Sequence, residues 1–132
     1  MALLNNLPNF FLYFAVALAL FGAFIFLYLH LTPYPELKLI REGNLSAAFA
    51  LLGSMLGFAL PLASAIAHSV SLLDMLVWGL VALVVQALVY LLVSRLLPEL
   101  RDGIHEDQTA HGLFLGGCAF CVGLINAACM VY

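Results

Sequence analysis

The chain has 132 residues, of which 66% are hydrophobic and only 8% are charged, and its mean hydropathy is +1.16. Because a soluble domain carries about 25% charged residues, this composition excludes a water-soluble globular protein. The formal net charge of −3 leaves no strongly basic surface, so no nucleic-acid partner is expected.

Four long apolar stretches, each almost free of charged residues, follow one another along the chain. A helix needs about 20 such residues to cross the hydrocarbon core of a bilayer. None of the stretches shows the two-residue alternation of a strand. The sequence therefore predicts an all-α membrane protein, a single transmembrane domain over 1–132, with four transmembrane helices at roughly 10–31, 46–67, 74–94 and 110–131.

A short segment that follows the first stretch returns later in the chain. Pro-Glu-Leu-Lys at 35–38 recurs as Pro-Glu-Leu-Arg at 98–101, an offset of 63 residues. At the same offset Gly53 corresponds to Gly116 and Ala65 to Ala128. We interpret the chain as two tandem parallel repeats, about 8–68 and 71–131, each made of two helices around a Pro-Glu-Leu turn. Because each repeat spans the membrane twice, both have the same orientation.

The first and third predicted helices are bulky, and their aromatic residues are expected to fill lipid-facing or interfacial positions. They include Phe24, Tyr28 and Tyr90. The second and fourth helices instead place small residues on one face, which lets helix backbones approach closely in lipid. We expect these two helices to pack face to face at the centre of the bundle, or against copies of themselves in a homo-oligomer, through Gly53, Gly57, Gly112, Gly116 and Gly123.

Polar residues inside the spans are few. We expect Gln86 of the third helix to pair near Ser54, and Asn126 of the fourth near Ser64. Pro61 removes a backbone donor from the second helix, and the freed carbonyl near Gly57 needs a partner. Two interpretations stay open: the polar residues form interhelical hydrogen bonds, or they line a path for a permeating molecule with Pro61 as its hinge.

The four Lys and Arg residues lie in two connections only. Lys38 and Arg41 are in the first connection, and Arg95 and Arg101 are in the third. Since positive charge marks the cytoplasmic side, both termini are expected to lie outside. The connections 32–45 and 95–109 would then face the cytoplasm and offer a docking place for a protein partner.

No arrangement of residues points to catalysis, a cofactor or a metal ion. His105, Asp107 and His111 lack the tight spacing of metal ligands. Cys118 and Cys121 fall inside a predicted span, where a reactive thiolate is disfavoured. We therefore expect no enzymatic activity.

Several segments resemble a known family. They are Asn-Leu-Ser-Ala-Ala at 44–48, Asp-Gln-Thr-Ala-His-Gly at 107–112, Leu-Gly-Phe-Ala-Leu-Pro-Leu-Ala-Ser-Ala at 56–65 and Ile-Asn-Ala-Ala-Cys-Met at 125–130. They are similar to the DUF350 family of small bacterial inner-membrane proteins, the YjfL type, over nearly the whole chain. The resemblance implies four spans, two repeats, a bacterial inner-membrane location and no established activity. Its members tend to lie beside phage-shock-type membrane-stress proteins.

The sequence thus predicts a small oligomeric integral inner-membrane protein with a structural or interaction role, linked by the resemblance to envelope stress. The alternative is a subunit of an oligomeric channel or transporter lined by the second and fourth helices.

Overall fold

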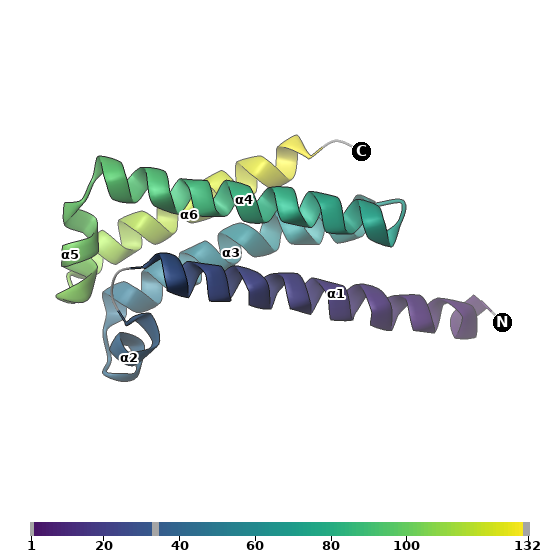
Figure 1. The fold of residues 1–132 in the computed structure, drawn as a ribbon, viewed down its shortest axis with the longest axis horizontal. Helices are drawn as coiled ribbons and strands as arrows, with labels where there is room; N and C mark the ends of the chain where they lie inside the picture. Colours follow the sequence, from purple (N-terminus) through teal and green to yellow (C-terminus); the bar gives the residue numbers. More distant parts are fainter. Residues whose placement is uncertain (1, 33–34, 131–132) are drawn as a thin grey trace.

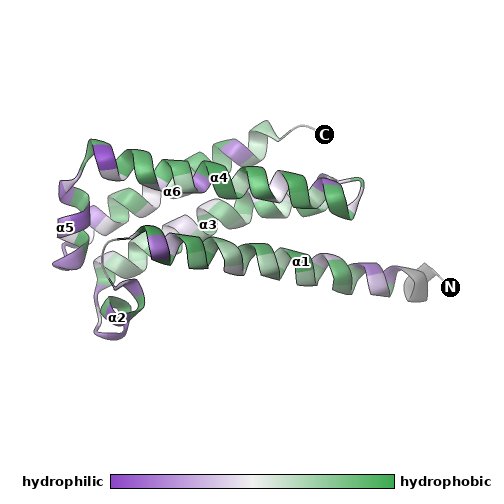
Figure 2. Ribbon diagram, viewed as in Figure 1, coloured by the Kyte–Doolittle hydropathy of each residue, from purple (hydrophilic) through white to green (hydrophobic). Residues whose placement is uncertain are grey.

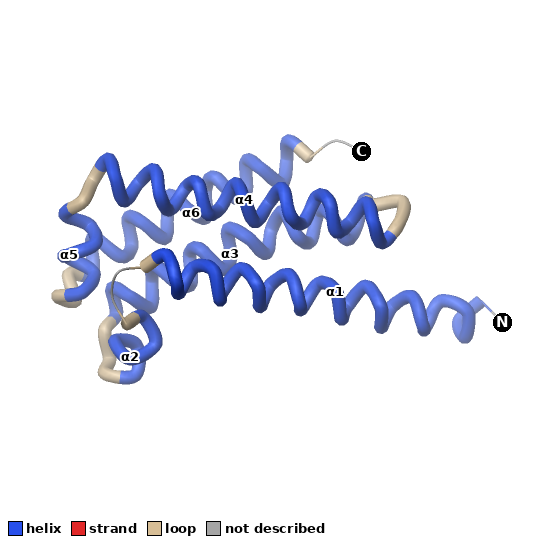
Figure 3. Tube along the Cα trace, viewed as in Figure 1, coloured by secondary structure: helices blue, strands red, loops and turns tan. Residues whose placement is uncertain are grey.

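The computed structural model describes residues 2–32 and 35–130, and within them the chain folds into six α-helices and no strand. Four long helices run alongside one another, and two short helices lie at one end of the bundle (Figure 1). Figure 3 shows that the connections between them are short. The helices are α1 (Ala2–Leu31), α2 (Glu36–Arg41), α3 (Leu45–His68), α4 (Leu72–Leu96), α5 (Glu99–His105) and α6 (Thr109–Cys129).

The four predicted spans are confirmed within a few residues. Each long helix contains a segment long and apolar enough to cross a membrane: Asn6–Leu31, Leu45–His68, Leu72–Leu96 and Thr109–Cys129. Hydrophobic residues cover the shafts of these helices in Figure 2, whereas α2 and α5 are largely hydrophilic. Positions 33, 34 and 131 of the predicted elements lie outside the described residues.

The two ends of the bundle differ in character. We call residues 32–45 and 95–109 the charged end, because they carry all four Lys and Arg residues. Both termini and the α3–α4 connection lie at the opposite end (Figure 1), which we call the terminal end. Helix α1 extends beyond the other helices there.

The Pro-Glu-Leu segments begin helices and are not turns, so the third connection, expected over 95–109, contains the helix Glu99–His105. Pro35 and Pro98 stand directly before α2 and α5, where a fixed φ and a missing N–H favour the start of a helix. Leu100 and Ile104, four residues apart on α5, are buried. The four-residue spacing of this apolar pair indicates a helix, but the many charged residues around it make the spacing hard to recognise in the sequence. The duplication itself stays a prediction.

Both short helices end in the same way. Gly43 after α2 and Asp107 after α5 have positive φ angles of 89° and 60°. The next backbone N–H, from Asn44 or Gln108, then donates to a carbonyl five residues earlier, at 2.9 Å and 2.8 Å. This Schellman-type ending satisfies the last carbonyls of each short helix and directs the chain into α3 or α6.

Helix α1 packs on α3 and α4 mainly through its second half, and Tyr13 and Val16 add contacts to the cluster around Ala65 and Met75. Its buried residues are Ala17, Leu20, Phe24 and Tyr28, and they recur at steps of three or four. The Phe24 ring stacks on Phe58 of α3 at 4.8 Å between centroids, and Tyr28 meets Tyr90 of α4 edge-on at 5.3 Å.

These contacts correct the expectation that the aromatic residues of the first and third helices face lipid. Phe24 and Tyr28 are each 2% exposed, and Tyr90 is 4% exposed. They are buried because α1 crosses over α3 and α4 at this depth. Phe10, Phe11, Phe14 and Phe26 do point outward.

Candidate functional site

The α3 and α6 helices meet backbone to backbone along a row of glycines. A methyl group added at Gly53 would overlap the backbone of Gly116, and one added at Gly116 would overlap the carbonyl of Phe49. Near the charged end, Gly112 lies against the backbone and hydroxyl of Ser46. The expected face-to-face packing of these two small-residue faces is therefore present within one chain.

The same close contact continues toward the terminal end. A methyl group at Gly57 would overlap the carbonyl of Ala119, and one at Gly123 would overlap the backbone of Gly57. Because apolar side chains gain little from association in lipid, this close backbone approach supplies much of the attraction between α3 and α6.

Gln86 of α4 joins α3 and α6 where they are closest. Its side-chain Nε2 donates to the Gly57 carbonyl at 3.1 Å and to the Ala119 carbonyl at 3.3 Å. Gln86 is only 2% exposed, so both bonds lie inside the protein. One amide thus connects three of the four spans.

Pro61 explains why the Gly57 carbonyl is available. In a regular helix this carbonyl would accept from the N–H four residues later, which is residue 61, and proline has none. Gln86 supplies the missing donor. The sequence placed Gln86 near Ser54; the structure puts its partner one turn further along α3, at the carbonyl that Pro61 leaves open. Ser54 itself is buried, at 3% exposure.

At the terminal end Ser64 of α3 contacts α6 at Ala127, the residue after Asn126, and not through the Asn126 amide that the sequence predicted as its partner. The contact runs through the backbone, because the Ser64 hydroxyl lies 3.5 Å from the Ala127 carbonyl, a long hydrogen bond. The buried Nδ2 of Asn126 has no hydrogen-bond partner among the described residues.

Asn44 links the two halves of the chain at the charged end. Its Oδ1 accepts from the N–H of Ala47 at 2.8 Å, which caps α3. Its Nδ2 donates to the Ile104 carbonyl at 2.9 Å and lies 3.4 Å from that of His105, both in α5. One buried side chain therefore satisfies the start of α3 and the end of α5.

Ser46 and Asp107 complete this link. The Ser46 hydroxyl accepts from the N–H of Gly112 at 2.9 Å and donates to the Gln108 carbonyl at 2.8 Å. The Ser46 N–H donates to Asp107 Oδ1 at 3.1 Å. The first turns of α3 and α6 thus cap each other. The sequence analysis did not foresee this reciprocal capping, which joins residues 61 to 66 positions apart.

The comparison with known proteins agrees with this architecture. A family model described as Domain of Unknown Function (DUF350) matches residues 2–130. The chain belongs to this family. The resemblance noted from the sequence is thereby confirmed.

Two relatives are similar over most or all of their length. The chain is 39% identical to the UPF0719 inner membrane protein YjfL of Escherichia coli (strain K12) over 132 residues, all of both chains. It is 30% identical to the UPF0719 transmembrane protein YshE of Bacillus subtilis (strain 168) over 110 residues, 82% of each chain. No solved structure matches the chain. The protein is a small integral inner-membrane protein with four spans.

The histidines, acids and cysteines outside these junctions do not converge. Over residues 2–32 and 35–130, no group of three potential metal ligands lies together. The ring of His111 instead packs against Gly103 of α5. The three cysteines are free, with Cys118 half-buried and Cys121 and Cys129 exposed.

Replacing Asn44 by alanine is expected to lower the free energy of unfolding by about 2 kcal/mol. The loss combines a helix cap, worth about 1 kcal/mol, with a buried bond to α5. Asn44→Ser keeps an oxygen for the Ala47 N–H but is too short to reach Ile104, so its free energy of unfolding should fall by about half as much. Denaturant titration in lipid micelles, followed by circular dichroism, measures the free energy of unfolding of both variants. An Asn44→Ala protein as stable as wild type would contradict the assignment.

Proposed function

We propose that the protein has a structural and interaction role in the bacterial inner membrane and acts without catalysing a reaction. In this proposal the four spans form a fixed frame that presents the charged end to a protein partner in the cytoplasm. The observation that carries the proposal is the set of hydrogen bonds from Asn44, Ser46 and Asp107, which holds α3, α5 and α6 in one arrangement.

The charged end has the character of a docking surface. It combines both signs of charge on two short helices, of which α5 is held down by a buried apolar side with Leu100 and Ile104. A surface with mixed charges favours a specific partner over non-specific electrostatic binding. Its exposed charged residues are Lys38, Arg41, Glu42, Arg95, Glu99, Asp102, Glu106 and Asp107, and His105 is exposed beside them.

The membrane interior supports the same proposal. Three of the four polar residues that a channel between copies would need lie inside a single chain. Gln86 and Ser54 are buried, and Ser64 contacts the α6 backbone. Interhelical hydrogen bonds of this kind contribute on the order of 0.6–1.7 kcal/mol each in membranes and fix how the helices sit.

Self-association is the second part of the proposal. The face of α3 and α6 that points away from α4 carries an open apolar groove of about 180 Å³. A methyl group at Gly117, in this groove, would meet no atom within 4 Å, so a second chain has room to approach closely. The groove is lined by Phe49, Leu52, Gly53, Leu56, Leu113, Gly116, Gly117 and Phe120.

Site-specific photocrosslinking in cells tests the docking surface. A photoreactive residue replaces Arg41 or Glu106, both exposed at the charged end, and Val84, exposed on the apolar shaft of α4, serves as the control. The proposal expects one discrete heavier adduct from positions 41 and 106 and none from 84. Equal adduct patterns at all three positions would refute it. Native mass spectrometry of the protein in nanodiscs gives the number of copies.

The alternative of an oligomeric channel or transporter subunit lined by α3 and α6 draws on one observation. The half-buried Asn126 carries an amide Nδ2 without a partner among the described residues. Ion and small-solute flux into liposomes that contain the purified protein decides between the two proposals. Liposomes that stay impermeable favour the structural role. Flux that is present with the wild type and abolished by an Asn126→Leu variant favours the channel.

The proposed orientation places the charged end in the cytoplasm and both termini outside. Its basis is the positive charge of the first and third connections, at Lys38, Arg41, Arg95 and Arg101. A C-terminal alkaline phosphatase fusion is therefore expected to be active, and a C-terminal green fluorescent protein fusion dark. The reverse pattern would show that the protein has the opposite topology.

A role in envelope stress is part of the proposal only through the family resemblance. A deletion strain challenged with membrane-permeabilising agents tests it.

A further inference from the structure

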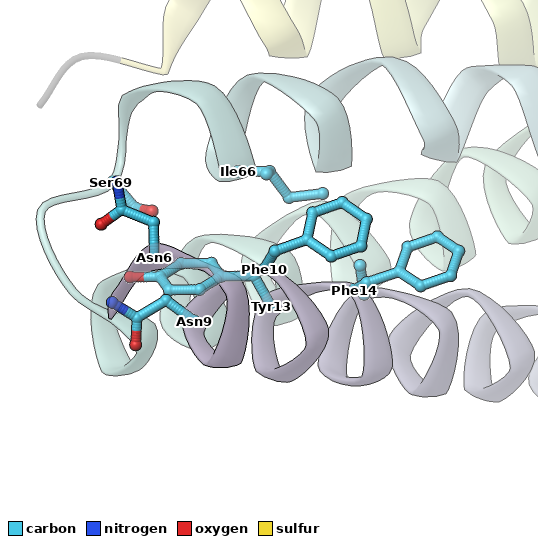
Figure 4. Close-up of a pocket in the computed structure, with 8 residues that line it drawn as sticks. Asn6, Asn9, Phe10, Tyr13, Phe14, Ile66 and Ser69 are labelled. Atoms are coloured by element: carbon cyan, nitrogen blue, oxygen red, sulfur yellow. The ribbon is translucent and has the colours of Figure 1, made fainter. Parts of the chain in front are cut away.

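An open groove of about 390 Å³ lies between the first half of α1 and the end of α3, at the terminal end of the bundle (Figure 4). Its size falls within the range of small-molecule sites in proteins, about 300–1,000 Å³. It is distinct from the glycine row and from the charged end. It is lined by Asn6, Asn9, Phe10, Tyr13, Phe14, Ala17, Ile66 and Ser69.

The packing of α1 explains why this groove exists. Helix α1 buries side chains from Ala17 onward, whereas residues 6–16 are exposed or partly exposed. Of these, Tyr13 and Val16 still pack against the buried cluster around Ala65 of α3 and Met75 of α4. Helix α3 ends at His68, and the chain then turns back through Ser69 into α4. The outer half of α1 therefore runs beside the end of α3 and leaves an open groove between them.

The lining changes from polar to apolar along the axis of α1. Asn6, Asn9 and Ser69 lie together at one end of the groove in Figure 4, and the rings of Phe10 and Phe14 lie further along, with Ile66 facing Phe10. The apolar part extends to Ala17, 11 residues after Asn6, which is about 16 Å deeper at 1.5 Å per residue.

This gradient runs from the end of the bundle toward the middle of the spans. Asn6 lies about one turn into α1 (Ala2–Leu31), and Ser69 directly follows the last residue of the second span. The polar end of the groove is therefore at the depth of lipid headgroups, and the apolar part is at the depth of acyl chains. A second copy of the chain or a wholly apolar ligand would not need such a gradient along the membrane normal.

The polar end is neutral and rich in hydrogen-bonding groups. Two amides and two hydroxyls can each donate and accept, and the buried Ser69 hydroxyl has no hydrogen-bond partner among the described residues. The Lys and Arg side chains that would bind an anionic headgroup all lie at the charged end. A carboxylate stands close by, because Asp74 accepts a bond from the N–H of Val70, next to Ser69.

From this combination we propose that the groove binds one zwitterionic phospholipid of the leaflet at the terminal end. The phosphate accepts from the Asn6 and Asn9 amides and from Ser69. The headgroup ammonium lies on the side of Asp74, and one acyl chain follows Phe10, Phe14 and Ala17. The site is a specific lipid site in addition to general contact with the bilayer.

The protein supplies a matched control groove. Five apolar residues of α4 line an open groove of about 420 Å³ that has no polar lining: Val77, Leu80, Val81, Val84 and Val85. It offers similar room for an acyl chain and nothing for a headgroup. A tryptophan at Val81 fills the control groove, and a tryptophan at Ile66 fills the proposed site.

The test uses the full chain in vesicles made of equal amounts of phosphatidylethanolamine and phosphatidylglycerol with identical acyl chains. Native mass spectrometry then counts the lipids that stay bound after release into detergent. Wild type is expected to retain one phosphatidylethanolamine at least fivefold more often than phosphatidylglycerol. Val81→Trp should retain it equally, and Ile66→Trp should lose it. Asn6→Leu combined with Asn9→Leu should lose the headgroup preference.

Three results would overturn the proposal. They are equal retention of both lipids by wild type, an equal loss in Ile66→Trp and Val81→Trp, and a second protein chain in place of the lipid. Circular dichroism melts of each variant show whether the fold is intact. If Ile66→Trp does not fold, the Asn6 and Asn9 double variant decides the question, because both side chains are exposed.

Discussion

Replacing Gly116 by alanine is expected to lower the free energy of unfolding by about 3 kcal/mol, although it adds a single methyl group. That methyl would overlap the carbonyl of Phe49, which belongs to the backbone of α3 and cannot rotate away as a side chain would. The helices must move apart to accommodate it, and overpacking of this kind costs about 1–3 kcal/mol or more. The glycine row loses its close contact at the same time.

Gly117 is the matched control for this prediction. It is the next residue on α6, it is exposed, and a methyl group there meets no atom within 4 Å. Because alanine favours a helix over glycine by up to about 1 kcal/mol, Gly117→Ala should be neutral or slightly stabilising in the isolated chain. Reversible unfolding in mixed micelles, followed by far-ultraviolet circular dichroism, compares the two. Equal effects at 116 and 117 would show that α3 and α6 do not meet as described.

Replacing Gln86 by leucine is expected to cost about 2 kcal/mol, mainly because the Gly57 carbonyl loses its donor inside the protein. A buried polar group without a partner costs about 1–3 kcal/mol. The loss should depend on Pro61. In a Pro61→Ala background the new N–H of residue 61 can bond to the Gly57 carbonyl, so Gln86→Leu should cost about 1 kcal/mol less.

A double-mutant cycle measures this coupling from the unfolding free energies of wild type, both single variants and the double variant. Asn44→Ala combined with Pro61→Ala provides the control, because Asn44 lies at the charged end and shares no bond with Gly57. That pair should be additive within about 0.5 kcal/mol. Additive effects of Gln86→Leu and Pro61→Ala would mean that the glutamine does not replace the donor that proline removes.

The spans could be predicted from the sequence because composition alone decides them. A run of about 20 apolar residues has few structures open to it in a bilayer. The glycine row was also visible, since Gly53, Gly57, Gly112, Gly116 and Gly123 recur at helical steps. Their spacing indicated the packing faces, and the structure brings those faces together within one chain.

The polar partners could be predicted only to within a turn. A proline always leaves one carbonyl open, and Gln86 is a polar residue at a similar depth, so their meeting was foreseeable in outline. The depth of a residue in the membrane does not fix the rotation of its helix. That rotation decides whether Gln86 meets the Ser54 hydroxyl or the Gly57 carbonyl, and it is set by packing over the whole interface.

The charged end was the part that the sequence described least well. Charged residues masked the helical spacing of Leu100 and Ile104, so we expected only a turn within the connection 95–109 where α5 lies. The bonds from Asn44 to the α5 carbonyls join residues 60 and 61 positions apart. Local signals predict that Asn44 can cap its own helix, but its second role depends on how the two halves come together.

The central claim is that the polar residues of the spans serve contacts between helices and do not line an aqueous path. Reaction with a membrane-impermeant thiol reagent tests this most directly. Cys118, Cys121 and Cys129 are first replaced by alanine, and one cysteine is then placed at Ser54 or, as the accessible reference, at Arg41. We expect Ser54→Cys to stay unlabelled in open membrane fragments while Arg41→Cys reacts fully. Labelling of position 54 at a rate close to that of position 41 would contradict the claim and favour a water-filled path.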